Sequence, residues 1–170
     1  MRMIDIRDAD VTADAAAIRG LWLEYLTWGN DELEARHGFR LPVLEAVEQG
    51  FAHIEDFSPP DGRLLLACDQ DSAVAIACLR RIGPATAEVK RMYVRPAYRR
   101  GGLGRAMLER LIDAATAAGY ARIRLDSSGF MAAAHAMYRS YGFVDIEPYA
   151  ESEIPDEYKR FWVFMERVLP

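Results

Sequence analysis

The residues with the clearest potential for chemistry are two arginines and a glycine-rich turn, Arg99-Arg100-Gly101-Gly102-Leu103-Gly104, placed between a strand-like run and an amphipathic helix. Glycines permit positive φ angles and close approach of the backbone to a ligand. The first N–H groups of the following helix would then point at a bound anion, and the helix dipole would favour it. The pattern predicts a diphosphate site. A capped loop with solvated arginines is the alternative interpretation.

Basic residues are concentrated around this turn. Residues 80–110 hold nine basic and two acidic side chains, a balance of +7 in a chain of net charge −5, so the remaining residues sum to −12. A local basic segment in an acidic chain favours one anionic ligand and argues against a nucleic-acid-binding surface.

Composition indicates a single domain over residues 1–170, because 51% of these residues are hydrophobic, enough for a sizeable core. Charges at the N-terminus do not fit a signal peptide. The longest apolar runs, Leu64–Cys68 and Ala73–Leu79, are too short to span a membrane. Both cysteines lie in these runs, so we expect Cys68 and Cys78 to be reduced and buried. A cytoplasmic protein without membrane contact is expected.

Hydrophobic periodicity indicates an α/β order of elements. Pro96 should end the strand before the glycine turn, and Gly119 and Gly142 should close the two later helices. Helices are expected from residue 12 or 13 through 25 and over 41–55, 103–118 and 131–141, and strands over 3–7, 63–68, 73–81, 86–94, 121–126, 143–146 and 160–167.

Two common phosphate-binding motifs fit poorly. No Gly-Lys-Ser/Thr follows the glycines, which excludes a Walker loop. The dinucleotide fingerprint is closer, with Gly102-Leu103-Gly104 before a helix and Asp126 ending the next strand. Its third small residue, however, falls on Met107, which is too large for close helix–strand packing. A nicotinamide or flavin cofactor is therefore disfavoured.

Arg99, Gly102 and Gly104 fit the pattern R/Q-x-x-G-x-G/A, and here the sequence resembles the GNAT superfamily of acetyl-coenzyme A-dependent N-acetyltransferases. Residues 88–96 resemble the fourth strand of that superfamily. The segment Ala134-x-x-x-Tyr138-x-x-x-Gly142-Phe143 is similar to its later A-x-x-x-Y-x-x-x-G-F segment. The resemblance extends over 86–143, whereas the first 60 residues match only as a strand and two helices. The chain departs from it at Met131, where many relatives carry asparagine.

The resemblance implies an α/β (α+β) three-layer fold. Its mixed, curved sheet would have six to seven strands, with the fourth and fifth splayed apart, and about four flanking helices. Acetyl-CoA would bind as co-substrate: β-strand-like bonds would hold the pantetheine arm, helix N–H groups the pyrophosphate, and a backbone N–H near residues 92–94 would polarise the thioester carbonyl. The implied cofactor-binding residues are Met92, Tyr93, Val94, Arg99, Arg100, Gly101, Gly102, Leu103, Gly104 and Arg105. No metal is required.

Acetyl transfer to an amine poses two proton problems. A lysine-like amine with a pKa of about 10.4 is only roughly one part in a thousand neutral at pH 7, so its proton must be removed. The resemblance implies that Tyr138 donates a proton to the departing thiolate; a core tyrosine is the alternative. It implies that Glu88 is the base, directly or through water, whereas a salt bridge to a neighbouring arginine is equally compatible. Strand alternation would put Glu88, Lys90, Met92 and Val94 on one face.

Other candidates carry weaker signals. In the superfamily the region of Trp22, Glu24, Tyr25 and Trp28 shapes the acceptor pocket, although such residues are more often core. Residues 1–79 hold six basic and fifteen acidic side chains, which would suit a cationic acceptor or simply form a solvated acidic surface. His135 lies near Tyr138, but a helix turns it about 60° away, which predicts a surface or supporting position.

The sequence therefore predicts an N-acetyltransferase, an acyltransferase acting by direct transfer in a ternary complex, because no cysteine is placed to carry the acyl group. The acceptor would be a primary amine of a small molecule, amino acid or peptide, with neither nucleic acid nor membrane as partner. The resemblance leaves a homodimer open. A non-catalytic acyl-CoA-binding sensor or scaffold is the alternative.

Overall fold

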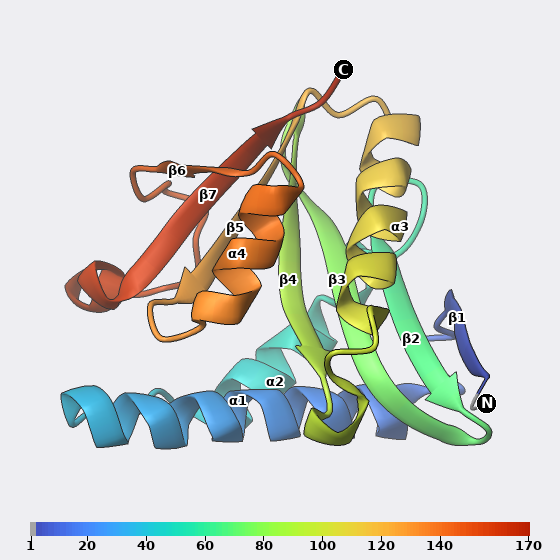
Figure 1. The fold of residues 1–170 in the computed structure, drawn as a ribbon, viewed down its shortest axis with the longest axis horizontal. Coiled ribbons are helices and arrows are strands. Elements are labelled where there is room, and N and C mark those ends of the chain that lie inside the picture. The colour runs from blue at the N-terminus through green and yellow to red at the C-terminus, as the bar shows by residue number, and fades with distance from the viewer. Residues whose placement is uncertain (1–2) are drawn as a thin grey trace.

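The computed structural model describes residues 3–170, in which seven strands form one mixed sheet between two layers of helices (Figure 1). The strand order is β1-β2-β3-β4-β5-β7-β6. Only β4 and β5 pair in parallel, and the other neighbours are antiparallel. The expected mixed α/β architecture is confirmed. In chain order the elements are β1 (Ile4–Asp8), α1 (Ala15–His37), α2 (Val43–Ala52), η1 (Ile54–Phe57), β2 (Arg63–Asp69), β3 (Ser72–Gly83), β4 (Thr86–Val94), η2 (Pro96–Tyr98), α3 (Leu103–Ala117), β5 (Arg122–Ser128), α4 (Ala132–Ser140), β6 (Val144–Ile146), η3 (Asp156–Phe161) and β7 (Trp162–Val168).

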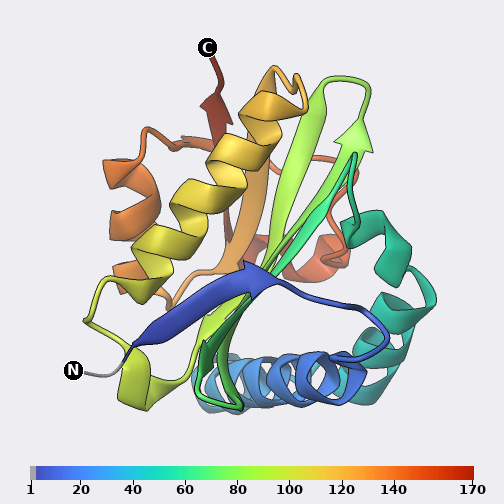
Figure 2. The same ribbon diagram turned by 90° about the vertical axis from the view of Figure 1, so that its right-hand side faces the viewer.

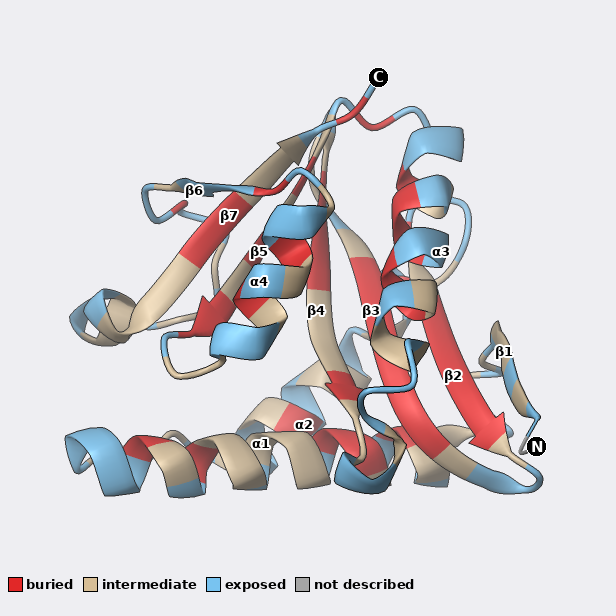
Figure 3. Cartoon of the chain, viewed as in Figure 1, coloured by how far each residue is buried: buried red, intermediate tan, exposed pale blue. Residues whose placement is uncertain are grey.

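Each face of the sheet carries its own hydrophobic core. On one face α3 and α4 bury Met107, Leu111 and Tyr138 against the strands. On the other face α1 and α2 bury Trp22 and Val47. Figure 2 shows α3 and α1 on opposite sides of the sheet. Figure 3 shows long buried stretches along β2 and β3. The sheet thus separates two hydrophobic cores.

Helix α1 is longer than its apolar periodicity predicts, ending at His37 instead of near Tyr25. Asn30 accounts for part of this extension: although polar, it is buried, its Nδ2 donates to the carbonyl of Leu41 (2.6 Å), and its Oδ1 accepts the Leu41 N–H (2.9 Å). These bonds fix the connection into α2. Neither α1 nor any other helix within residues 3–170 is long and apolar enough to cross a membrane.

A β-bulge in β4 corrects the expected alternation of its side chains. Tyr93 pairs with Ile76 but Lys90 pairs with Cys78, so β4 contains one extra residue there. Arg91 takes the positive φ of 49° that accommodates it. The prediction that Glu88, Lys90, Met92 and Val94 share a face is therefore wrong. Glu88 and Lys90 face the α1 and α2 side, whereas Met92 and Val94 pack with the α3 and α4 core.

The two cysteines are free and buried, as predicted. Cys78 lies on β3 in the core formed with α1 and α2. Burial raises the pKa of its thiol to about 12. The thiol therefore stays protonated at neutral pH and is a poor nucleophile.

Candidate functional site

Strands β4 and β5 form a fork. They pair only where Thr86–Glu88 meet Arg122–Arg124, and beyond that point β5 continues beside β7 while β4 runs away from it (Figure 1). Along residues 89–94, β4 therefore has no strand partner on this side within the described chain. An open strand edge offers backbone donors and acceptors to an extended ligand. The expected splaying of the fourth and fifth strands is confirmed.

The predicted diphosphate loop lies at the N-terminus of α3, beside the fork. Gly102 is the N-cap residue with φ 82°, a conformation that favours glycine. No side chain caps α3, and its first turn contains no acidic residue. Arg100, Gly101 and Gly102 are exposed. A Cβ at Gly104 would lie 3.8 Å from Cε of Met92 and 3.9 Å from Cγ2 of Val94, so the helix start adjoins the open edge of β4. Free N–H groups at a helix start suit an anion.

The side chain of Arg99 points toward the fork. Its Nε donates to the carbonyl of Val94 (2.8 Å). Its guanidinium lies over the rings of Trp28 and Tyr93, 5.1 and 5.6 Å from their centroids. Arg105 extends toward α4, where it donates to Oγ of Ser140 (3.3 Å). In this conformation the cations of Arg99 and Arg105 flank the loop, and its backbone N–H groups form the centre of the candidate anion site.

Tyr138 projects from α4 into the fork. Its hydroxyl lies 4.0 Å from Sδ of Met92, and its ring packs beside Phe143. Burial raises its pKa above the ordinary value of 10, with smaller contributions from Tyr25 and the charge of Asp126. The hydroxyl is therefore protonated at neutral pH and is available as a proton donor. The structure brings Tyr138, Met92 and the start of α3 together, as the sequence predicted.

Glu88 lies deeper than expected. Its side chain is 1% exposed, its Oε1 accepts from Nε and Nη2 of Arg80 (3.0 and 2.9 Å), and its Oε2 accepts from the hydroxyl of Tyr149 (2.7 Å). The arginine salt bridge considered as its alternative role is present. Burial, the largest influence, raises the pKa of Glu88, although Lys90 and Arg80 oppose that effect.

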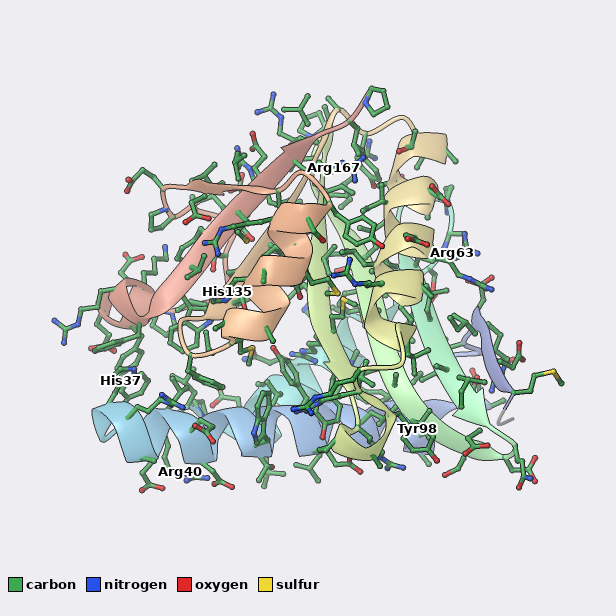
Figure 4. All side chains as sticks on the ribbon, viewed as in Figure 1. His37, Arg40, Arg63, Tyr98, His135 and Arg167 are labelled. Carbon is green, nitrogen blue, oxygen red and sulfur yellow. The ribbon has the colours of Figure 1, made fainter. Side chains whose placement is uncertain are left out.

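His135 occupies a buried position, not a surface one. It is 4% exposed, and its Nε2 lies 3.0 Å from Oγ of Ser127 on β5 (Figure 4). Burial lowers its pKa. The 60° offset from Tyr138 is too small to turn His135 away, because a helix buries a stripe at least 100° wide. His135 therefore anchors α4 to β5.

A cavity of about 750 Å³ opens on the α1 and α2 side of the fork. Tyr25 lines it, as expected for the acceptor region, whereas Trp22 is fully buried in the core. Glu24 pairs with Arg95 at 2.5 Å, and Trp28 packs edge-on against Phe130.

Charged residues on the cavity wall include two that sequence reasoning did not assign to this site, Asp126 and Glu153. Asp126 lies two residues before the end of β5, beyond the point where β5 pairs in parallel with β4, and such a position near the carboxyl end of a parallel strand could have identified it. Glu153 lies in an irregular segment without periodicity. Lys90 donates to it (2.7 Å) and Arg80 also binds it (3.0 Å); burial alone would raise its pKa, but these cations lower it to about 2.

Comparison with protein families gives one match. The model of the acetyltransferase (GNAT) family matches residues 22–143, which include β4, the loop before α3 and the whole of α4.

Sequence relatives include acetyltransferases. The IAA acetyltransferase of Azospirillum brasilense is 38% identical over 99 residues, which are 56% of this chain and 63% of that protein. An uncharacterised N-acetyltransferase of Schizosaccharomyces pombe is 34% identical over 103 residues, 59% of this chain and 63% of that protein. The chain thus spans less than two thirds of the length of these relatives.

Solved structures share the fold over nearly the whole chain. An acetyltransferase from Streptococcus agalactiae has a TM-score of 0.75 at 23% identity, with 99% of this chain and 100% of that chain covered. The PaiA N-acetyltransferase of Thermoplasma acidophilum, in complex with coenzyme A, has a TM-score of 0.74 at 17% identity, with 98% and 99% covered. At these identities the likeness establishes the fold.

Proposed function

Because this chain belongs to the GNAT acetyltransferase family, we propose that it transfers the acetyl group of acetyl-CoA to a primary amine. One observation carries the proposal: the fork of β4 and β5 has the α3 loop and Tyr138 on one side and a cavity on the other. A donor and an acceptor that entered from opposite sides would meet at the fork.

The residues present fit acetyl-CoA. The uncapped start of α3, with Gly102 in the left-handed region, suits its pyrophosphate, and the open edge of β4 suits its pantetheine arm. Met92, Tyr93, Val94 and residues 99–105 would hold it. Bound acetyl-CoA supplies an activated acetyl thioester. The chain's own residues then orient the two substrates and exchange protons with them.

Tyr138 would give its proton to the leaving sulfur. A phenol kept neutral by burial is a donor in the required protonation state. Transfer would be direct, because both cysteines are buried and the Cys78 thiol is held protonated. We further propose that residues 1–170 form one acetyltransferase domain in the cytoplasm, a reducing compartment that suits two free thiols.

Glu88 remains our predicted base, acting through water. Both of its carboxylate oxygens already accept hydrogen bonds, and it is absent from the described residues that line the cavity. These contacts favour proton removal through an intervening water over direct contact with the amine.

A panel of amines tests the activity. Purified protein is incubated with acetyl-CoA and single amines, and released thiol is measured. We expect turnover with at least one amine above the background of the Gly102→Asp variant, which should not bind the donor. If acetyl-CoA binds but no amine gives turnover, the chain is an acyl-CoA sensor, not an enzyme.

Replacing Glu88 with glutamine tests the base. A base acts only when deprotonated, so activity that depends on Glu88 is present above its pKa and is lost as the pH falls through that raised value. The ratio of wild-type to variant kcat/KM should therefore be about 100 at neutral pH and fall in acid. Taking the ratio cancels titration of the amine itself.

Glu153→Gln is the matched control for this substitution, since Glu153 binds the same two cations, Arg80 and Lys90. Its pKa of about 2 keeps it ionised across the measured range. Its ratio should not vary with pH. A ratio that is equally independent of pH for Glu88→Gln would rule out Glu88 as the base.

A further inference from the structure

Three of the charged side chains that line the cavity form ion pairs. Arg80 binds Glu88 and Glu153, and Lys90 binds Glu153. Arg91 and Asp126 also line the cavity, yet neither forms an ion pair with any residue in the part of the chain that the structure describes. Glu45 and Asp56 line the cavity from the α2 side, and among the described residues they form no ion pair either. Arg91 and Asp126 differ from them in lying on β4 and β5, the two strands of the fork, where they carry opposite charges.

Contacts with an aromatic ring and a backbone carbonyl, and no carboxylate among the described residues, position the guanidinium of Arg91. Its guanidinium lies 4.4 Å from the centroid of the Trp22 ring, and its Nη2 donates to the carbonyl of Ala46 (2.9 Å). Its Nη1 is buried and, among the described residues, has no acceptor. A Cβ at position 50 would lie 2.2 Å from Nη1, so Gly50 leaves the room that the guanidinium occupies. Burial lowers the pKa of Arg91.

Removing a guanidinium from water without a counter-ion costs several kcal/mol. The side chain is nevertheless fixed by Trp22, Ala46 and Gly50 instead of turning outward into solvent. A prepositioned guanidinium presents a fixed positive charge, which suits a carboxylate bound in the cavity.

Asp126 lines the same cavity from β5, just beyond the residues where β4 and β5 pair. Its Oδ2 accepts from Oγ of Ser152 (2.8 Å), a neutral donor that leaves its charge uncompensated. The next residue, Ser127, contacts His135 on α4 (3.0 Å), so Asp126 lies on the strand that packs against the helix carrying Tyr138. Tyr25 lines the same cavity; burial and the charge of Asp126 raise its pKa and Arg91 lowers it, with a result of about 12.

We infer that the acceptor is an amine that also carries a carboxylate, as an amino acid does, with the carboxylate on Arg91 and the ammonium group facing Asp126. This inference rests on the proposed N-acetyl transfer and names the substrate class. It places the reacting nitrogen beside Tyr138, at the fork. A diamine would instead bring its second cation against Arg91, where like charges repel.

Three acceptors that differ only at the carboxylate test the inference: an amino acid, its amide and its decarboxylated amine. With wild-type protein, kcat/KM should be at least about 10-fold higher for the acid than for either analogue. Arg91→Gln should abolish this preference while acetyl-CoA still raises the melting temperature. Arg81→Gln is the matched control; Arg81 is an exposed arginine on β3 that pairs with Asp61 and should leave the preference intact.

The outcomes separate the two proposals. Equal kcat/KM for the three acceptors, across several side chains, would overturn the carboxylate assignment and leave acetyl transfer standing. No turnover with any amine would overturn the proposed function itself. If Arg91→Gln does not fold, Arg91→Lys keeps the charge without the guanidinium fixed by Trp22 and Ala46, and it should weaken the preference. The wild-type series alone still decides the substrate class.

Discussion

Replacing Tyr138 with phenylalanine is expected to lower kcat for acetyl transfer about 100-fold, the typical loss when a general acid is removed. The KM for acetyl-CoA should stay within about twofold, because the lost interaction matters only as the thiolate departs. The fold should persist, since the hydroxyl lies 4.0 Å from Sδ of Met92 and the ring packing with Phe143 is retained. Steady-state kinetics with both substrates varied would measure each quantity.

Tyr141→Phe provides the control for this substitution. Tyr141 follows α4 directly, and its hydroxyl bonds Glu109 on α3, away from the fork. Its loss should leave kcat unchanged. If Tyr138→Phe turned over as fast as wild type, Tyr138 would be a core residue, the alternative that the sequence left open.

Saturating acetyl-CoA is expected to raise the melting temperature by about 5–10 °C at 100 times its Kd, since such binding adds about 2.7 kcal/mol to the stability of the folded state. Gly102→Asp should abolish this shift. Its carboxylate would lie at the uncapped start of α3, where the pyrophosphate is proposed to bind. Two like charges there repel, so affinity should fall about 100-fold or more. Thermal unfolding with and without acetyl-CoA measures both effects.

Gly102→Ala separates charge from backbone strain. It places the same Cβ at φ 82° without adding a carboxylate. Aspartate is also a favourable N-cap residue, so the Gly102→Asp protein should remain folded. We expect Gly102→Ala to retain part of the thermal shift. A full shift in Gly102→Asp would remove the diphosphate assignment.

The sequence was most informative where strong local signals bound an element. The limits predicted for β4, 86–94, agree with the structure, and α3 ends one residue before its predicted limit. Pro96 and Gly119 mark these ends, and both act through backbone conformation alone. The extension of α1 could not be foreseen in this way, because it depends on the tertiary contact between Asn30 and Leu41.

The candidate site also contains residues that the sequence identified and residues that it did not. The loop before α3 and Tyr138 belong to compact motifs, so sequence sufficed to bring them together. The partners of Glu88 did not follow from the sequence, because Tyr149 lies 61 positions away in a segment without periodicity. The place of Arg91 in the cavity could not be predicted either, because regular alternation would have turned its side chain toward the α3 and α4 side.

The bulge at Arg91 also determines which substitutions the two faces of β4 can accept. A strict strand imposes one phase on all its side chains, so a register shift alters both faces at once. In β4 the extra residue of the bulge shifts the alternation of side chains, so the segments before and after Arg91 alternate independently. Substitutions of Lys90 or Arg91 can therefore vary the cavity without disturbing Met92 and Val94 on the opposite face. On the binding roles proposed above, acceptor preference and donor binding would be set by different residues of one nine-residue strand and would change independently.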